Sequence, residues 1–498
     1  MNLLRITSLL LFLHTSVLYG AKHFTYTPLA RDAYENVMSL RFGEAHLQLA
    51  KLKLEDPNNL VVHHIENYID FFRLYITEDK ALYKQLEANK DRRLSAIETG
   101  DESSPYYLFL QADIRLHWAL VSLRFEDYLP AFTDVNRANK LLEKNQERFP
   151  DFIPNLKDLA ILHAMVGTIP DGYQWSVRLL SSLKGTIDQG KKEMEKVVSY
   201  ARQHDDFLFT KESQVLQAYL LLHLANEPQQ AWKTIRKSEL VPADNPLHAF
   251  VVANIAMRTG HNDEAIRILE AAPQDGIFHP LPFLEFMLGL AKLRRLDRDA
   301  GKHFDRFVEK FNGTHYIKEA YQKLAWQALI NGDPTGYRTN LVQVSQRGNA
   351  TSGGDSNAQR EADAGRTPHV DLVRARLLFD GGYAQKAYDR LAPLKLNESK
   401  DAYLRLEYTY RMGRILQELD RTAEAISYFE KTIEDSGANS PYFFACNAAL
   451  QCGLIYEKIE SWQKAKEYFK KCLLLNPDEY ATGLHQRAKA GLARIRKR

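Results

Sequence analysis

The stretch from Gly185 to Lys192 resembles a phosphate-binding loop more than any other stretch of this sequence does. Glycines stand at its first and sixth positions, and Lys191 follows the second glycine. A P-loop also needs Ser or Thr after that lysine to hold magnesium, and a preceding strand that aims backbone N–H groups at phosphate. Lys192 takes the hydroxyl position, and the preceding residues have a helical pattern. We therefore predict a turn between two helices, with nucleotide binding as the weaker alternative.

A second stretch that could do chemistry holds His63 and His64, with Glu66 close by. A helical zinc motif needs histidines four residues apart with a glutamate beside the first. Adjacent histidines point to different faces of a helix, so we predict packed or solvated histidines and no metal site.

The rest of the chain lacks the motifs that commonly carry catalysis. It has no Gly-x-Ser-x-Gly elbow, no kinase motif set, and no Gly-x-Gly-x-x-Gly after a strand. The three cysteines have no metal-binding spacing, and we predict that they are buried thiols: Cys446, Cys452 and Cys472. We expect a protein that is not an enzyme and binds no cofactor.

The elements that position these residues show best between Cys446 and Glu479, a stretch of 34 residues. Tyrosine, alanine, phenylalanine and proline follow a glycine at offsets of 3, 12, 16 and 24 residues: Gly453, Tyr456, Ala465, Phe469 and Pro477. This stretch resembles the tetratricopeptide repeat, a helix–turn–helix unit of that length. The resemblance is clearest over residues 402–498. It implies an all-α fold, a right-handed solenoid of antiparallel helix pairs.

Pairs of small residues 12 positions apart recur upstream, in degenerate form. They include Ala253 with Ala265 and Ala375 with Ala387, and Ala45 stands 12 residues before Pro57. Apolar residues recur with helical spacing from Asp32 to Val344, without alternation typical of strands. We predict helical repeats along nearly the whole chain.

A weaker resemblance covers about residues 41–201. There an apolar helix ends at Ile-Pro, and Gly167–Leu183 carries a turn before aromatic and leucine positions. This pattern is similar to the inclusion-body-clearance and tetratricopeptide-repeat-protein-39 family. That resemblance implies only a helical-repeat adaptor.

Composition divides the chain. Residues 346–368 are rich in Gly, Ser, Asn and Asp and nearly lack apolar side chains, so we predict a flexible low-complexity linker. It separates a divergent helical-repeat domain, residues 21–345, from a C-terminal tetratricopeptide domain, residues 369–498. A helix from Tyr480 to Lys497 should cap the last repeat, because a terminal repeat needs a polar outer face.

The first twenty residues have the pattern of a secretory signal peptide, with Arg5 before an apolar stretch and a cleavage site before Ala21. We expect an exported protein, periplasmic or secreted, most readily in a bacterial envelope. A retained N-terminal anchor is the alternative. No later stretch is apolar enough to span a membrane. The net charge of +3 gives no basic field for nucleic acid. The basic C-terminal end leaves peripheral association with acidic lipid open.

The resemblance also implies a binding surface, because the first helix of each tetratricopeptide pair lines a concave groove that takes peptides. In that register eight residues face the groove: Glu407, Tyr410, Arg414, Gln417, Asn447, Leu450, Leu454 and Glu457. They do not reproduce the Lys/Asn clamp that chaperone-binding members use for a terminal carboxylate.

We therefore predict a scaffold or adaptor that binds a protein or peptide partner in the groove. The alternative is a helical envelope protein that binds a glycan or small ligand on aromatic platforms around Tyr106, Tyr107, Trp118 and Trp175.

Overall fold

The computed structural model describes residues 20–168, 183–437 and 440–496. Nearly all regular structure in these ranges is α-helical, and apart from one isolated bridge between His23 and Asn59 they contain no β-structure. The predicted all-α fold is confirmed. The residues expected to form a signal peptide lie outside the described ranges, except Gly20.

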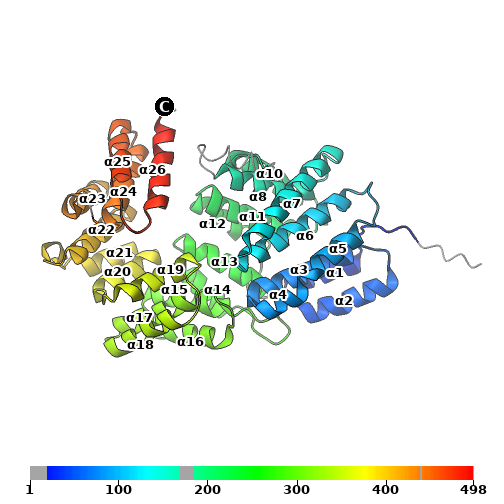
Figure 1. Cartoon of the computed structure of the whole chain (residues 1–498), viewed down its shortest axis with the longest axis horizontal. Coiled ribbons are helices and arrows are strands. Elements are labelled where there is room, and N and C mark those ends of the chain that lie inside the picture. The colour runs from blue at the N-terminus through cyan, green and yellow to red at the C-terminus, as the bar shows by residue number, and fades with distance from the viewer. Residues whose placement is uncertain (1–19, 169–182, 438–439, 497–498) are drawn as a thin grey trace, which may run out of the picture.

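The helices follow one another with short connections (Figure 1). The N-terminal ones are α1 (Pro28–Met38), α2 (Phe42–Glu55), α3 (Val61–Thr77), α4 (Lys80–Leu86), α5 (Ala88–Ile97), α6 (Pro105–Arg124), α7 (Tyr128–Arg148), α8 (Pro154–Gly167), α10 (Ile187–Ala201), α11 (Thr210–Tyr219) and α12 (Pro228–Arg236). The central ones are α13 (Pro246–Arg258), α14 (Asn262–Glu270), α15 (Phe283–Arg295), α16 (Ala300–Lys310), α17 (Ile317–Ile330), α18 (Pro334–Gln346) and α19 (Gly353–Ala364). The C-terminal ones are α20 (Val370–Asp380), α21 (Ala384–Leu391), α22 (Ala402–Glu418), α23 (Thr422–Ser436), α24 (Phe444–Lys458), α25 (Trp462–Leu474) and α26 (Ala481–Arg496).

From α13 onward the helices form a regular stack of antiparallel pairs. The first helices of the pairs, α13, α15, α17, α20, α22 and α24, pack in one row, each against the next, and α26 extends this row. The partner helices are α14, α16, α18, α21, α23 and α25. Each packs against its own first helix, and all of them except α18 also pack against the first helix that follows. In Figure 1 the colours run from the blue N-terminal helices through the green α13 and α14 to the red α26. This architecture confirms the solenoid of helix pairs.

Small residues explain why the paired helices approach so closely. A Cβ atom on Gly453 would lie 2.5 Å from the Phe469 ring, and one on Gly413 would lie 2.6 Å from the Phe429 ring. Ala425 and Ala465 on the facing helices are fully buried. Only glycine admits the ring at these crossings, so the residues that the spacing picked out are the ones that set the pair geometry.

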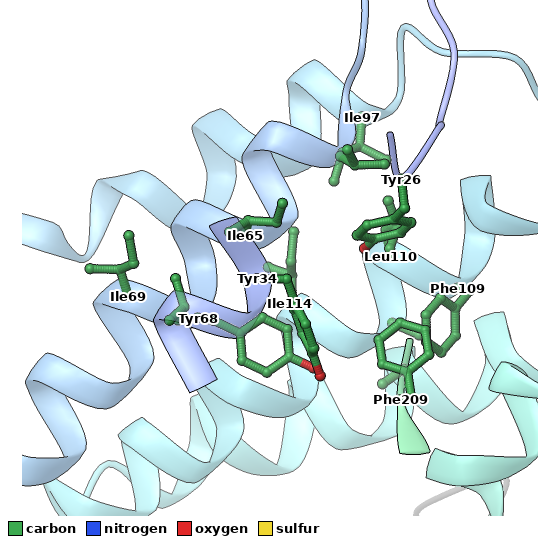
Figure 2. Packing of buried hydrophobic residues seen from close by; sticks show 14 of the residues in the cluster. Tyr26, Tyr34, Ile65, Tyr68, Ile69, Ile97, Phe109, Leu110, Ile114 and Phe209 are labelled. Atoms are coloured by element: carbon green, nitrogen blue, oxygen red, sulfur yellow. The ribbon is translucent and has the colours of Figure 1, made fainter. Parts of the chain in front are cut away.

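The N-terminal helices share a core that is more polar and more irregular. Tyr34 and Tyr68 meet edge to face with ring centroids 5.5 Å apart, and Figure 2 shows their hydroxyls converging. Both hydroxyls donate to the Glu212 carboxylate, at 2.9 and 3.1 Å. The other Glu212 oxygen accepts from Lys157 Nζ at 2.7 Å. Helices far apart in sequence are thus joined through one carboxylate.

Helix α1 and the turn after it also contact the start of the regular stack. The Asn245 amide donates to the Met38 carbonyl at 3.1 Å, and the His279 backbone N–H donates to the Leu40 carbonyl at 2.7 Å. These bonds join segments more than 200 residues apart in sequence. The N-terminal array and the central stack are therefore one continuous structure.

The expected flexible linker, residues 346–368, is wrong for its middle part, because Gly353–Ala364 forms helix α19. The Asp355 carboxylate is fully buried and accepts hydrogen bonds from the backbone N–H groups of Tyr316 and Glu319, at 2.7 and 2.9 Å. Polar contacts to the repeat body order a segment that its composition alone would leave unfolded. The other expected domain limits remain predictions.

The C-terminal capping helix is confirmed as α26 (Ala481–Arg496). A Cβ atom on Gly491 would lie 2.4 Å from the Phe469 ring, so α26 packs on the last repeat as the next first helix would. Across the ranges that the structure describes, no helix has both the length and the apolar character needed to cross a membrane.

Candidate functional site

A cavity of about 810 Å³ lies between the first helices of the C-terminal pairs. Helices α20, α22, α24 and α26 contribute to its wall, as do Gln322 and Trp326 of α17 and four residues of α19. Residues of the connecting segments complete the lining: Arg366, Pro368, Tyr442, Phe443, Glu479 and Tyr480. Glycine and alanine occupy the face of each first helix that packs on its partner helix. The larger polar residues lie on another face of the same helix, which is the face toward this cavity. We refer to this cavity as the concave groove.

The structure brings half of the predicted groove residues to this cavity. Glu407, Tyr410, Arg414 and Asn447 line it. Their arrangement is fixed by hydrogen bonds, because the Tyr410 hydroxyl lies 2.7 Å from the Asn447 amide nitrogen and 3.2 Å from Arg414 Nη1. An adjacent pair of repeats thus presents a tyrosine, an asparagine and an arginine at one point of the groove.

The other four predicted residues lie elsewhere. Leu450 is fully buried in the core of the repeats, so its place on the groove surface was wrong. Its apolar side chain gains more from the packed core than from an exposed wall. Leu454 packs at the edge of the same core. Glu457 binds the Arg494 guanidinium of α26 through both oxygens, each at 2.7 Å. Gln417 is half-buried and outside the cavity lining.

Most carboxylates of the concave groove already have partners. Glu407 accepts from Arg411 Nε at 2.8 Å, one helical turn away. Glu361 accepts from the Gln322 amide at 2.6 Å and from the Trp326 indole N–H at 2.8 Å. Glu407 is thus paired with a cation, whereas the donors to Glu361 are uncharged and leave its negative charge in the groove.

Three arginines of the groove have no carboxylate partner within the described residues: Arg360, which bonds Asn357 and Tyr480, and the pair Arg414 and Arg487. Arg414 bonds only to the Tyr410 hydroxyl, its Nε is buried without an acceptor, and its guanidinium lies 5.3 Å from the Phe379 ring centre. Arg487 of α26 forms no hydrogen bond or ion pair with any residue in the described ranges. Desolvation and then the Arg414 charge lower the pKa of Arg487. Two like charges that face one cavity favour an anion between them.

Aromatic rings surround the arginines at the groove entrance. The Arg366 guanidinium lies 4.3 Å from the Tyr403 ring centre, and that of Arg360 lies 4.9 Å from the Tyr480 ring centre. Sequence reasoning missed these residues and Arg487, because they lie outside the two stretches in which the repeat spacing is clear. Only the packing of the helices brings them to the groove. The only sequence signal was the basic C-terminal end, for which we considered only association with acidic lipid.

The motifs singled out for nucleotide and metal chemistry are structural. In the near P-loop, Thr186 caps α10 by accepting from the Gln189 backbone N–H at 3.0 Å. Gly190 lies inside that helix, where a Cβ would be 2.3 Å from the Ala160 carbonyl oxygen. Residues 183–186 are therefore a non-helical segment before α10, and residues 187–192 lie within that helix, so the expected turn covers only the start of the motif. Most residues of the helix expected before it lie outside the described ranges. No group of three or more metal-ligating side chains occurs in the described part of the chain.

The paired histidines are also packed, as predicted. His64 is fully buried, with Nδ1 2.6 Å from the Tyr26 hydroxyl and Nε2 2.8 Å from Asp113. His63 lies 3.8 Å from Glu66 on the neighbouring face. The three cysteines are free and buried, again as predicted.

The aromatic platforms of the alternative hypothesis are largely core residues. Trp118 is buried, and its indole N–H donates to Asn67 at 2.9 Å. The Tyr106 ring packs on Phe152 with centroids 4.9 Å apart, and Tyr107 packs on Phe24. Trp175 and most of Gly167–Leu183 lie outside the described residues.

A stack of antiparallel helix pairs with a concave groove defines a helical-repeat protein. The chain matches the tetratricopeptide repeat family over residues 406–434 and 448–479, so the repeats formed by α22–α23 and α24–α25 are tetratricopeptide repeats. Repeats of this family support a role in protein–protein interaction.

Among solved structures, the yeast Tom70 structure is 16% identical, with 94% of this chain and 96% of that one covered and a TM-score of 0.25. The Cut9–Hcn1 hetero-tetramer of the APC/C is 13% identical, with coverages of 92% and 96% and a TM-score of 0.23. Naa15/Naa10 bound to HypK-THB is 13% identical, with coverages of 94% and 66% and a TM-score of 0.25. No curated protein sequence is significantly similar to this chain.

Proposed function

We propose that this chain is a non-enzymatic scaffold that binds an acidic segment of a partner protein in the concave groove. The observation that carries the proposal is the pair Arg414 and Arg487, two cations that share one cavity and lack a carboxylate partner among the described residues. A carboxylate between them relieves the repulsion between the two guanidinium groups.

The surrounding residues favour a peptide over a free anion. Asn447 and Tyr410 supply hydrogen-bonding groups at the same point, and the aromatic rings of Tyr403 and Tyr442 offer apolar contact along the groove. A cavity of about 810 Å³ is large enough for several side chains of an extended or helical segment. Acidic and aromatic residues in one segment would use both kinds of contact.

The test measures binding of a short fluorescein-labelled peptide of alternating glutamate and tyrosine by fluorescence anisotropy. A matched peptide of lysine and tyrosine is the probe of opposite charge. We expect the acidic peptide to bind, with an affinity that falls as salt rises. The double variant Arg414→Glu/Arg487→Glu should weaken binding by at least about tenfold, because like charges then face each other.

A matched control is Lys466→Glu/Lys470→Glu. These exposed lysines lie on the outer helix α25 of the same domain, so the change in net charge is the same while the groove is untouched. Equal loss of affinity in both double variants would mean that overall charge and not the groove attracts the peptide. Absence of binding by the wild-type chain would contradict the proposal.

We further propose that the protein is exported, through the signal-like residues 1–20. The support is the sequence pattern alone, with Arg5 before an apolar stretch and small residues before Ala21. Intact-mass measurement of the protein isolated from its source should give a mature chain that begins at Ala21. A full-length mass in the cytoplasmic fraction would contradict export.

The cysteines give export a second test. Cys446 Sγ and Cys472 Sγ lie 3.6 Å apart on the two helices of the last repeat. In an oxidising compartment we expect an external disulfide to exchange with these thiols before folding buries them. The Cys446–Cys472 bond forms, the external S–S bond breaks, and the external pair leaves as two thiols that carry the two electrons and the two protons. Thiol titration of the unfolded, isolated protein should then find Cys452 as the single free thiol. Three free thiols would argue for a reducing compartment.

A further inference from the structure

Helix α19 (Gly353–Ala364) is not a member of the repeat stack. The first helices α17 and α20 pack directly against each other, and α15 also contacts α20, so the stack is continuous without α19. The chain makes a detour between these two helices and places α19 against α17 and α18.

This detour fills part of the concave groove. Asn357, Arg360, Glu361 and Ala364 of α19 line the same cavity as Tyr410 and Arg414. Glu361 accepts from Gln322 and Trp326, which are the residues through which α17 contributes to the cavity wall. An acidic side chain of the protein itself therefore occupies the hydrogen-bonding groups at one end of the groove.

The same helix reaches across to the far wall. Arg360 Nη2 donates to the Tyr480 hydroxyl at 3.1 Å, and that hydroxyl also bonds Asn357. Just after α19, the Arg366 guanidinium stacks on the Tyr403 ring. Contacts between residues about 120 positions apart in sequence thus bridge the entrance between α17 and the start of α26.

Helix α19 is held to the rest of the protein by polar contacts and buries few of its side chains. Only Asp355 and Ala358 of its twelve residues are buried, and the helix contains no large apolar side chain. Two glycines, Gly353 and Gly354, open it. An isolated helix of this length and composition is not stable in water, so α19 keeps its form only while the groove holds it.

We propose that α19 is a displaceable strap that occupies the concave groove and competes with the acidic partner segment. The inference rests on the proposed function for the identity of the competitor. Displacement by a partner exchanges the Glu361 carboxylate for carboxylates of the partner. It also releases Arg360 and Arg366 from Tyr480 and Tyr403. The strap therefore lowers the affinity of the groove for the acidic partner segment. Segments with few acidic residues do not bind tightly enough to displace it.

The first measurement needs no partner. Hydrogen–deuterium exchange of the free full-length protein should find the α19 amides exchanging at least about tenfold faster than those of α17 and α20, because a weakly held helix opens locally. Protection of α19 equal to that of α17 would overturn the inference, whatever the groove binds.

The second measurement uses the glutamate–tyrosine peptide. Replacing Gly353–Ala364 by a Gly/Ser segment of equal length should tighten peptide binding by at least about tenfold, the ratio expected if the open form is a tenth of the population or less. Saturating peptide should also speed exchange of α19 in the wild-type protein. Unchanged or weaker binding by the replaced chain, or slower exchange of α19 on binding, would show α19 to be part of the binding wall.

A milder variant keeps the test valid if the replaced chain does not fold. Tyr480→Phe keeps the ring and removes the hydroxyl that bonds Asn357 and Arg360. It should speed α19 exchange and tighten peptide binding, by less than the replacement does. Tyr468→Phe, on the outer helix α25, is the matched control and should change neither. If the peptide binds no variant, the proposed function fails, and α19 exchange in the free protein and in Tyr480→Phe still decides on the strap.

Discussion

The N-terminal helices are joined through a buried ion cluster, whereas the C-terminal repeats are joined through glycines that pack on phenylalanine rings. Lys157 is almost fully buried and pairs with Asp113, Asp158 and Glu212 at 3.0, 2.9 and 2.7 Å. In the repeats, Gly413 and Gly453 meet Phe429 and Phe469 in the same way twice. One region is specified by a single cluster of charges and the other by a repeated apolar contact.

The two regions differ in how the loss of a single side chain affects their stability. Burial alone would lower the pKa of Lys157, but the three acids raise it well above its usual value. Burial, with Asp113 and Glu212, raises the pKa of Asp158 against the pull of Lys157. Asp158 is therefore the acid of this cluster that is most readily protonated, and removing any one member leaves buried charges without a partner. The repeats, by contrast, distribute their stability over equivalent contacts.

The variant Lys157→Met should have the largest effect and tests whether the ion cluster stabilises the N-terminal helices alone. The variant leaves Asp113 and Glu212 buried without their cation, so the N-terminal helices should lose about 3–5 kcal/mol of unfolding free energy. Urea unfolding with hydrogen exchange resolved by region should find the loss in residues 20–236, with the C-terminal repeats unchanged.

The control for that variant is Lys211→Met. Lys211 pairs with Glu35 at 2.7 Å, but both side chains are more than a third exposed, so the loss should stay below about 1 kcal/mol. An effect of Lys157→Met no larger than this would mean that the cluster does not hold the N-terminal region together.

Acid should next separate the N-terminal and central helices from the C-terminal repeats. Burial, with a smaller effect of Lys211, lowers the pKa of His248 to about 4 from 6.5. The folded state therefore favours the neutral ring, and its contribution is complete above pH 6.5 and lost as pH falls toward 4. Burial also lowers the pKa of other histidines between residues 117 and 279: His117, His223, His261 and His279.

Urea unfolding at pH 7 and pH 4.5 checks this dependence. His248 alone should contribute a loss of about 2–3 kcal/mol over that interval. His248→Gln cannot titrate and should reduce the loss by that amount, although it lowers stability at pH 7. An identical pH dependence in the variant and the wild type would contradict the assignment.

The stability of the C-terminal repeats should depend on steric fit at the glycines and not on charge. Gly453→Ala places a methyl group 2.5 Å from the Phe469 ring, and the shift of the helix pair should cost about 1–3 kcal/mol. Gly483→Ala, in α26, meets no atom within 4 Å, and it should be neutral or stabilise by about 0.5–1 kcal/mol. Thermal unfolding measures the stability of both variants. Equal transition temperatures would mean that the close contact between Gly453 and the Phe469 ring does not stabilise the repeat.

This contrast also explains what the sequence could predict. Gly453 and Phe469 belong to a contact that recurs with a fixed spacing, so the fold, the helix register and four groove residues followed from it. Lys157 lies 44 positions from Asp113 and 55 from Glu212. No periodic pattern joins them, because their contact depends on how α6, α8 and α11 cross. Arg487 and the α19 residues escaped prediction for the same reason, since a detour of the chain brings α19 to the groove and the packing of α26 on the last repeat brings Arg487 there.

Buried hydroxyls provide the finest comparison with the ion cluster. Thr409 and Thr432 are fully buried in adjacent helices of one repeat, with their Oγ1 atoms 2.9 Å apart. Unlike Lys157, each also has a backbone carbonyl within reach, of Arg405 and Tyr428 respectively. Thr432→Val should therefore cost only about 1 kcal/mol, because Thr409 keeps a partner.

The double variant Thr409→Val/Thr432→Val sharpens the point. It removes both hydroxyls and leaves neither unsatisfied, so its unfolding free energy should lie within about 1 kcal/mol of the wild type and be no lower than that of the single variant. A double-mutant cycle from urea unfolding measures the coupling. A coupling of several kcal/mol would mean that the repeats, like the N-terminal cluster, depend on a specific polar pair, and the difference between the two regions would then be one of degree.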